Sequence, residues 1–265
     1  MRKLVLFFLA LSLVFAGCSK SSDSSSKSSK SSKSSSKKKK DKKKKKKSSY
    51  TELDAVTGGG SVSGTVTYAG DQKDGSVTFT KDKEVCKNAD GTDTAVEGAL
   101  VAADGKLKNA VVYLTGIKEG KKFTSESVTV DNVGCVFVPR VAIGKKGGKL
   151  VAKNSDPVLH NTHLYLKKGN KNIFNIALPT TKPIEKPLRK SGLVDVKCDA
   201  HEWMQAYLYV SEHPYATVTD ASGAFSMSDV PAGEYSGKVW HEKLGEKDFK
   251  VKVDAGGSAT VAVAF

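Results

Sequence analysis

The chain has 265 residues, of which 43 are Lys or Arg and 28 are Asp or Glu, so its formal net charge is +15. Residues 1–49 carry 16 of the basic residues and 2 of the acidic ones, and subtraction leaves 27 basic against 26 acidic residues for 50–265. The lysines of this nearly neutral part are not interleaved with stacking aromatic residues, which argues against a nucleic-acid-binding surface. No serine–histidine–acid triad, phosphate-binding glycine loop or paired-carboxylate signature stands out, so we expect no enzyme activity.

Residues 1–17 have the character of a signal peptide. Arg2 and Lys3 precede an apolar run, 4–15, that is too short to span a bilayer as a stable helix. The small residues before Cys18 resemble a bacterial lipobox, which implies cleavage before this cysteine and its lipidation. An ordinary secretory signal with a chance cysteine is the alternative. We therefore expect an exported protein that a lipid anchors to a membrane, on the extracytoplasmic side.

Residues 18–49 are expected to form a disordered tether. Positions 19–49 contain only Ser, Lys and Asp, in numbers of 15, 14 and 2. A segment without apolar side chains cannot offset its ordering entropy by burial. The lysine-rich stretch 37–47 could bind anionic headgroups or cell-wall polymers, or it could be a solvated spacer.

The remaining residues predict an all-β fold. Short runs rich in β-branched and aromatic residues are mostly bounded by Gly, Asn, Asp or Pro. These runs cover 61–68, 110–114, 194–196, 206–210 and 251–253. The longest helical candidate, 180–190, contains Pro183 and Pro187, which break a helix.

An outer sequence pattern begins in residues 60–66 and 107–114 and resumes at 216–242. Within it, Asp220–Gly223 predicts a hairpin turn and Pro231–Gly233 predicts a second hairpin turn before the next strand. The pattern resembles the carboxypeptidase regulatory-like domain, a small transthyretin-like sandwich without catalysis of its own. The resemblance implies that residues 50–130 and 212–265 form two parts of one sandwich.

An inner pattern, residues 131–211, carries the candidate chemistry. Cys198, His201 and Met204 follow one another at three-residue steps, and a His160-Asn161 pair lies upstream. Copper that cycles between two oxidation states needs ligands acceptable to both, and soft sulfur with imidazole meets that need. The spacing allows one tight loop to direct three donors to one point, while a distant strand supplies His160.

These residues resemble the cupredoxins, most closely the amicyanin and plastocyanin group. The resemblance implies a cupredoxin-like Greek-key β-sandwich interleaved with the transthyretin-like one. It further implies one mononuclear type 1 copper ion bound by His160, Cys198 and His201, with Met204 as the axial ligand. Asn161 would brace the cysteine loop through a hydrogen bond. We expect His201 near the surface, where it would be the exit route for electrons.

Other metal chemistries fit this loop less well. A binuclear copper centre needs two loop cysteines, and a multicopper oxidase needs a histidine on each side of the cysteine, where Lys197 and Asp199 stand. Zinc is the better rival, since a closed tetrahedral set could come from His160, His163, Cys198 and His201. However, His160 and His163 are three residues apart, so on one strand they would point to opposite faces.

Two cysteines, Cys86 and Cys135, are left once Cys18 is assigned to lipid and Cys198 to metal. In an oxidising compartment such a pair is expected to form a disulfide. Two buried free thiols are the alternative.

Taken together, the sequence predicts an exported, lipid-anchored blue-copper electron carrier. Its partners would be redox proteins such as cytochromes or a dehydrogenase. One alternative is a lipoprotein that binds or sequesters copper without redox cycling. Another is a structural cell-surface β-sandwich module with a degenerate metal site.

Overall fold

A computed structural model describes residues 50–265 except 71–75, 89, 93, 97–104 and 180. The expected signal peptide, the lipidation site Cys18 and the tether lie outside the described residues. Every regular element in the described part of the chain is a strand, which confirms the all-β prediction. That part of the chain has no helix that is long and apolar enough to cross a membrane.

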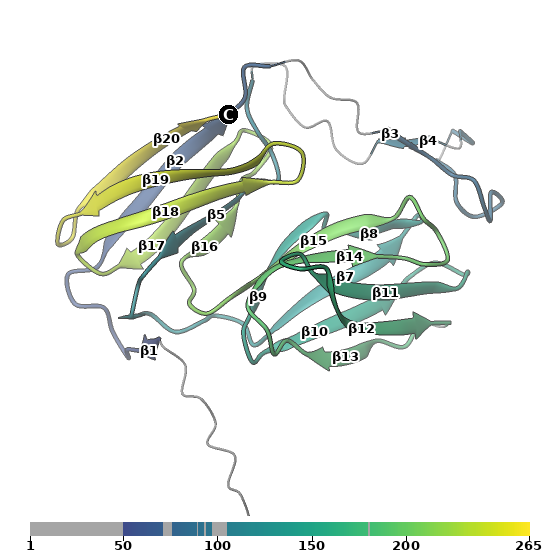
Figure 1. Cartoon of the computed structure of the whole chain (residues 1–265), viewed down its shortest axis with the longest axis horizontal. Coiled ribbons are helices and arrows are strands. Elements are labelled where there is room, and N and C mark those ends of the chain that lie inside the picture. Colours follow the sequence, from purple (N-terminus) through teal and green to yellow (C-terminus); the bar gives the residue numbers. More distant parts are fainter. Residues whose placement is uncertain (1–49, 71–75, 89, 93, 97–104, 180) are drawn as a thin grey trace, which may run out of the picture. The chain divides into compact units, whose positions relative to one another are not determined.

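Strands β7 to β15 form two packed sheets, which we call the inner sandwich (Figure 1). Its four-stranded sheet has the order β13-β10-β7-β8, and its five-stranded sheet has the order β12-β11-β14-β15-β9. The pairs β7–β10 and β9–β15 are parallel, and the other pairs are antiparallel. The bounds are β7 Ser127–Val133, β8 Val136–Val138, β9 Val141–Lys145, β10 Lys149–Asn154, β11 His160–Leu166, β12 Lys171–Leu178, β13 Ile184–Pro187, β14 Gly192–Lys197 and β15 Gln205–Ser211.

Alternating burial along the strands produces the core of this sandwich. In β14, Val194 and Val196 are fully buried, whereas Asp195 between them is only half-buried. This period of two places every second side chain between the sheets. The core includes Leu150 and Leu208 and extends to Cys198 and Met204.

An outer sandwich is built from strands on both sides of the inner one in the sequence (Figure 1). Its sheets have the orders β16-β5-β18-β19 and β17-β2-β20, and both sheets contribute to one core. The bounds are β2 Gly60–Thr67, β5 Val111–Thr115, β16 Ala216–Val218, β17 Ala224–Val230, β18 Gly233–His241, β19 Gly245–Val253 and β20 Ser258–Ala264. Two further pairs are β1 (Thr51–Glu52) with β6 (Glu119–Gly120), and β3 (Ser76–Thr78) with β4 (Thr94–Val96).

The predicted turn Asp220–Gly223 is present, but the hairpin prediction is wrong. Strand β16 pairs with β5 and strand β17 pairs with β2, so this turn carries the chain from one sheet to the other. Gly223 has a φ of +71°, and a Cβ there would lie 2.5 Å from the carbonyl oxygen of Val66. The turn therefore needs glycine at this position.

Aromatic side chains and one ion pair join residues of the two sandwiches. The rings of Tyr113 and Tyr209 are stacked with centroids 4.3 Å apart. Arg140, which lies over the ring of Tyr207, binds the Glu242 carboxylate through two hydrogen bonds, of 3.0 Å from Nε and 2.7 Å from Nη2. The Glu242 side chain is only 4% exposed and that of Arg140 16%, so this pair is largely removed from water.

We expect Glu242→Gln to lower the free energy of unfolding by about 3 kcal/mol, because it leaves the buried guanidinium of Arg140 without its counter-charge. The matched control is Glu185→Gln, which breaks the Lys149–Glu185 ion pair, whose side chains are 58% and 54% exposed. That change should cost at most about 1 kcal/mol. Urea denaturation of both variants measures the difference, and equal losses would contradict the stabilising role of the Arg140–Glu242 pair.

Candidate metal site

The register of two antiparallel strands brings His160 beside Cys198. His160 is the first residue of β11, and Cys198 directly follows the last residue of β14. These strands pair with His163 opposite Lys197. The start of β11 and the end of β14 therefore meet at the same end of the sheet, although the two residues are 38 positions apart.

A tight loop between β14 and β15 places His201 and Met204. The amide of Met204 donates to the carbonyl of His201 at 3.0 Å, and the amide of Cys198 lies 3.4 Å from the carbonyl of Met204. Since Lys197 pairs with Gln205 in the flanking strands, the loop is closed at its base. Cys198 and Met204 both belong to the buried core of the inner sandwich, and the Met204 side chain is 1% exposed.

Three donor atoms converge inside this end of the sandwich. The Cys198 Sγ lies 3.8 Å from the Nδ1 of His160 and 3.8 Å from the Nδ1 of His201. The three ligand atoms all lie within 4.8 Å of one another, and all three residues are buried. A metal ion at about 2.0 Å from nitrogen and 2.3 Å from sulfur, in one plane with its ligands, would hold the sulfur about 3.7 Å from each nitrogen. The donor set therefore fits a single metal ion with trigonal sulfur and nitrogen ligands.

Asn161 connects β11 to the cysteine loop. Its Oδ1 accepts hydrogen bonds from the amides of Asp199, at 2.7 Å, and Ala200, at 3.1 Å. Its own amide points to the Cys198 Sγ at 3.5 Å, and its Nδ2 donates to Asn175 at 2.8 Å. These bonds fix the sulfur and the start of the loop against the strand that carries His160.

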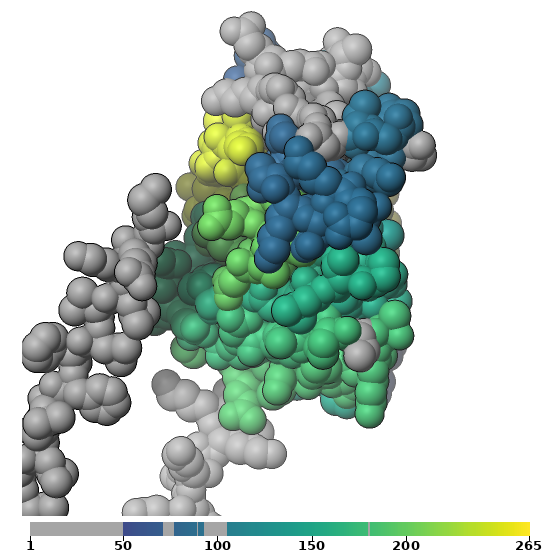
Figure 2. All heavy atoms as spheres, turned by 90° about the vertical axis from the view of Figure 1, so that its right-hand side faces the viewer, coloured from purple at the N-terminus to yellow at the C-terminus, as the bar shows by residue number. Residues whose placement is uncertain are grey.

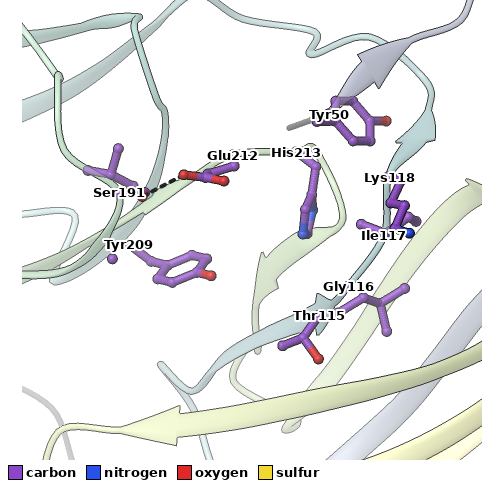
Figure 3. Close-up of a pocket in the computed structure, with 12 residues that line it drawn as sticks. Tyr50, Thr115, Gly116, Ile117, Lys118, Ser191, Tyr209, Glu212 and His213 are labelled. Carbon is purple, nitrogen blue, oxygen red and sulfur yellow. Dashed lines mark hydrogen bonds between the residues drawn. The ribbon is translucent and has the colours of Figure 1, made fainter. Parts of the chain in front are cut away.

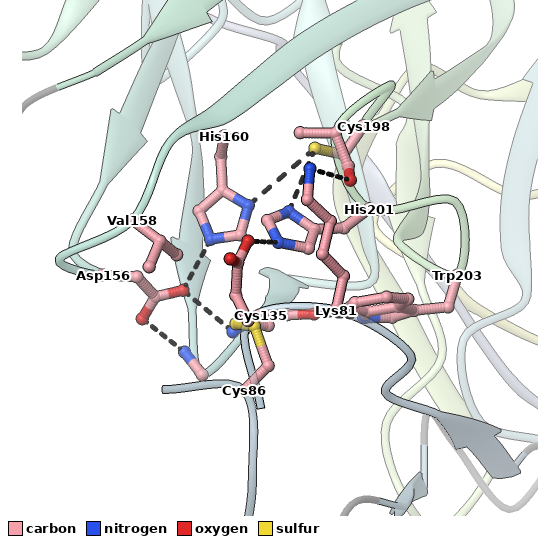
Figure 4. The surroundings of a disulfide bond; sticks show 12 residues. Lys81, Cys86, Cys135, Asp156, Val158, His160, Cys198, His201 and Trp203 are labelled. Atoms are coloured by element: carbon pink, nitrogen blue, oxygen red, sulfur yellow. Dashed lines mark hydrogen bonds and ion pairs between the residues drawn. A yellow bond between two sulfur atoms is a disulfide. The ribbon is translucent and has the colours of Figure 1, made fainter. Parts of the chain in front are cut away.

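Each of the two converging histidines has a carboxylate at its outer ring nitrogen. The Nε2 of His160 lies 3.0 Å from Asp156 Oδ2, and the Nε2 of His201 lies 2.8 Å from Asp82 Oδ2. Because a carboxylate accepts the Nε2 proton, each ring turns its Nδ1 toward the sulfur. Figure 4 shows His160, His201 and Cys198 arranged in this way beside the disulfide.

The expectation that His201 lies near the surface is wrong. Its exposed fraction is 0%. Asp82 covers its outer nitrogen, and Trp203 lies against its ring with centroids 4.9 Å apart. The loop sequence alone could not predict the contact between His201 and Asp82, because Asp82 stands 119 positions before His201.

Hydrogen bonds around the buried Cys198 thiol and His160 shift the pKa values of both groups in the absence of a metal. Burial, the largest single effect, lowers the pKa of His160, but hydrogen bonds with Asp156 and Cys198 outweigh it and raise that pKa from 6.5 to about 9. Burial raises the pKa of the Cys198 thiol, but hydrogen bonds with His160 and with backbone amides outweigh it and lower that pKa. Both shifts favour the thiolate form of Cys198, which is the form that binds metals.

Cys86 and Cys135 form a disulfide, and Cys198 is the free cysteine of the described residues. The disulfide lies beside the donor set. The amide of Cys135 donates to Asp156 Oδ2 at 2.8 Å, on the oxygen that also faces His160. Cys135 of the disulfide and His160 thus both contact the Asp156 carboxylate (Figure 4).

His163, the fourth member of the alternative zinc set, lies apart from the three converging donors. Its Nδ1 is 3.0 Å from the Asp199 carboxylate, and its Nε2 accepts a hydrogen bond from the Asn172 amide at 3.0 Å. Both ring nitrogens are therefore engaged elsewhere. This arrangement does not support a closed four-ligand zinc site.

A separate cavity of about 490 Å³ contains none of the four predicted ligands. Figure 3 shows Tyr50, Tyr209 and His213 around it. Burial lowers the pKa of His213 there. Ser191 donates to the Glu212 carboxylate at 2.8 Å on the same wall.

Comparison with known proteins gives only distant structural neighbours. No protein-family model and no curated protein matches the chain. Among solved structures, a reduced amicyanin variant is similar over 32% of this chain and 82% of its own, with 17% identity and a TM-score of 0.29. A purple cupredoxin from Nitrosopumilus maritimus is similar over 32% of this chain and 99% of its own, with 23% identity and a TM-score of 0.28. A copper-containing nitrite reductase from Thermus scotoductus matches over 34% of this chain and 24% of its own, with 21% identity and a TM-score of 0.30.

We expect metal binding to release about one proton per ion at pH 7, because Cys198 and His160 together hold one proton that the metal ion must displace. The affinity for Zn²⁺, a redox-inert probe, should rise about tenfold per pH unit and level off above the His160 pKa of about 9. Calorimetry of the metal-free protein in buffers of different ionisation enthalpy measures the proton count.

The control is Asp156→Asn, which removes the carboxylate that holds up the His160 pKa. Its affinity should level off at a lower pH than that of the unmodified protein. A proton count near zero at pH 7 in the unmodified protein would contradict a proton held by Cys198 and His160.

Proposed function

We propose that this chain is an exported, lipid-anchored blue-copper protein that carries single electrons between redox partners. The observation that carries the proposal is the equal 3.8 Å separation of the Cys198 Sγ from the Nδ1 atoms of His160 and His201. Thiolate, two imidazoles and a buried thioether suit copper in both of its common oxidation states. The site would hold one ion, with Met204 as the axial ligand.

Bound copper would supply one-electron oxidation and reduction, and the protein would supply a fixed and dry environment. The ligand residues Cys198, His160 and His201 are 3%, 0% and 0% exposed, so water and substrates have no access to the donor atoms. Asn161 holds the cysteine loop on β11. A ligand set fixed in this way has little freedom to rearrange between the two states, which favours rapid electron transfer.

The same burial supports a carrier rather than an enzyme. An enzyme that used this ion to transform a substrate would need an open coordination position. Among the described residues, the three ligand residues are buried, and Asp82 and Trp203 contact His201. We therefore propose transfer of electrons to partner proteins across the surface, the partners being cytochromes or a dehydrogenase.

An extracytoplasmic location agrees with the Cys86–Cys135 disulfide, since disulfides persist mainly in oxidising compartments. The proposed lipid on Cys18 and the Lys- and Ser-rich tether would keep the folded part near the membrane and free to move. The nearly balanced charge of residues 50–265 gives no reason to propose a nucleic-acid partner.

A copper-loaded sample should show a visible thiolate-to-copper charge-transfer band and a reversible one-electron reduction. Cys198→Ser should abolish the band, because oxygen replaces the only ligand sulfur that is charged. The absorption and electron spin resonance spectra measure both effects. Copper binding with the band but without reversible reduction would favour the alternative of a protein that holds copper without cycling, and a wild-type sample without the band would refute the blue-copper site.

Met204→Leu should change the reduction potential and the electron spin resonance spectrum, because it removes the weak axial ligand that tunes such sites. Met227→Leu is the matched control, since Met227 is also buried, at 5% exposure, but belongs to the core of the outer sandwich. Voltammetry of both variants makes the comparison. Equal and small shifts would show that Met204 only fills the core.

A further inference from the structure

The segment of residues 79–87, which we call the cap, lies against the inner sandwich although it belongs to the connection between two strands of the outer one. It follows β3 in the chain between β2 and β5. The disulfide from Cys86 to Cys135 fastens it to the turn between β7 and β8. In Figure 2, blue atoms of this part of the chain rest on the green and teal atoms of later residues.

Apolar contacts also hold the cap in place. Phe79 is 1% exposed and forms a buried cluster with Cys86 and Cys135. Its ring lies 5.4 Å from the ring of Trp203, which lies 4.9 Å from the ring of His201. The indole Nε1 of Trp203 donates to the carbonyl of Cys135 at 2.9 Å. The cap is thus packed on the loop that carries the metal ligands.

Asp82 is the residue that the cap delivers to the site. Its carboxylate lies 2.8 Å from the Nε2 of His201. Its own carbonyl accepts the amides of Val85 and Cys86, at 2.9 and 2.8 Å, so the residue is held at the start of a turn that ends at the disulfide. Lys81 also reaches toward the carbonyl of Ala200, at 3.5 Å.

The disulfide connects the two carboxylates that orient the ligand histidines. Asp156, which holds His160, accepts the amides of Gly134 and Cys135 at 2.7 and 2.8 Å. Asp82, which holds His201, lies on the other side of the same bridge, four positions before Cys86. One covalent bond therefore fixes both histidine partners relative to each other.

We propose that Asp82 is a positioning residue for the metal ligand His201, and that the Cys86–Cys135 disulfide keeps it there by holding the cap closed over the site. This inference rests on the proposed copper site. Asp82 accepts the Nε2 proton of His201, which leaves the Nδ1 lone pair directed at the metal position. Its negative charge also favours the more highly charged, oxidised state of a bound copper ion.

The test compares Asp82→Asn and Asp82→Ala with Glu84→Gln. Glu84 is an exposed carboxylate of the same cap two positions away, so its substitution removes the same charge from the same segment. The Asp82 variants should lose copper to a chelator about 10–100-fold faster than the unmodified protein. Their reduction potentials should rise, whereas Glu84→Gln should leave both the rate and the potential nearly unchanged.

A second readout uses the protein without metal. Nitrogen NMR of the imidazole rings should find His201 protonated on Nε2 in the unmodified protein and in Glu84→Gln, and a mixture of both tautomers in Asp82→Ala. This result does not depend on copper, so it separates failure of the cap proposal from failure of the proposed function. Asp82 variants that match Glu84→Gln in tautomer, copper loss and potential would overturn the proposal.

The disulfide is tested with the double variant Cys86→Ser and Cys135→Ser. Iodoacetamide should alkylate Cys198 at least about tenfold faster in this variant than in the unmodified metal-free protein, because an open cap exposes the thiolate. Mass mapping of the Cys198 peptide separates this reaction from any at Cys18. A folded double variant with unchanged Cys198 reactivity and an unchanged rate of copper loss would overturn the role of the disulfide. If the double variant does not fold, the Asp82 and Glu84 variants decide the proposal.

Discussion

A sulfur and two imidazole nitrogens converge in one buried space, where a negative charge on the sulfur needs a compensating positive charge. The Cys198 Sγ is 3.8 Å from both Nδ1 atoms, and its residue is 3% exposed. An uncompensated anion at such a place would cost several kcal/mol. Without metal, the proton of His160 supplies the compensation, as its raised pKa indicates. In the proposed loaded state a copper ion replaces that proton. The three converging groups at this end of the inner sandwich therefore suit a bound cation.

The fold meets this constraint through strand register rather than through one local motif. His160 begins β11 and Cys198 follows β14, so antiparallel pairing brings them to the same end of one sheet. The hydrogen bonds of Asn161 to the amides of Asp199 and Ala200 then set the position of the loop. A slip of one residue between β11 and β14 would turn alternate side chains to the other face and separate the sulfur from the histidine. The site is consequently as rigid as the core that holds Cys198 and Met204.

The sequence allowed the convergence of His160, Cys198 and His201 to be predicted, because two of them share one short loop and the third begins a strand. The steps of three from Cys198 to Met204 define a loop, and the all-β class follows from short alternating runs such as 206–210. The cover over His201 could not be predicted, because Asp82 comes from a connection in the outer sandwich, 119 positions away. The sheet change at Asp220–Gly223 was missed for a related reason. Turn residues specify a local bend, whereas the pairing partners of the strands on each side depend on long-range contacts.

The interleaving of the two sandwiches has an energetic consequence for the site. The cap is part of the chain between β2 and β5 of the outer sandwich, and the disulfide at Cys86 fastens it to the inner sandwich. A crosslink between residues 49 positions apart removes chain entropy worth about 4 kcal/mol from the unfolded ensemble. If a closed cap strengthens metal binding by orienting His201, the bound metal must strengthen closure by the same factor, since coupling between two sites is reciprocal. The metal would then stabilise contacts that reach into the outer sandwich, and a loss of order there would weaken the hold on the metal. If the cap instead followed the inner sandwich at the end of the chain, only one of its ends would be attached. Closure of such a cap could not couple metal binding to the outer sandwich.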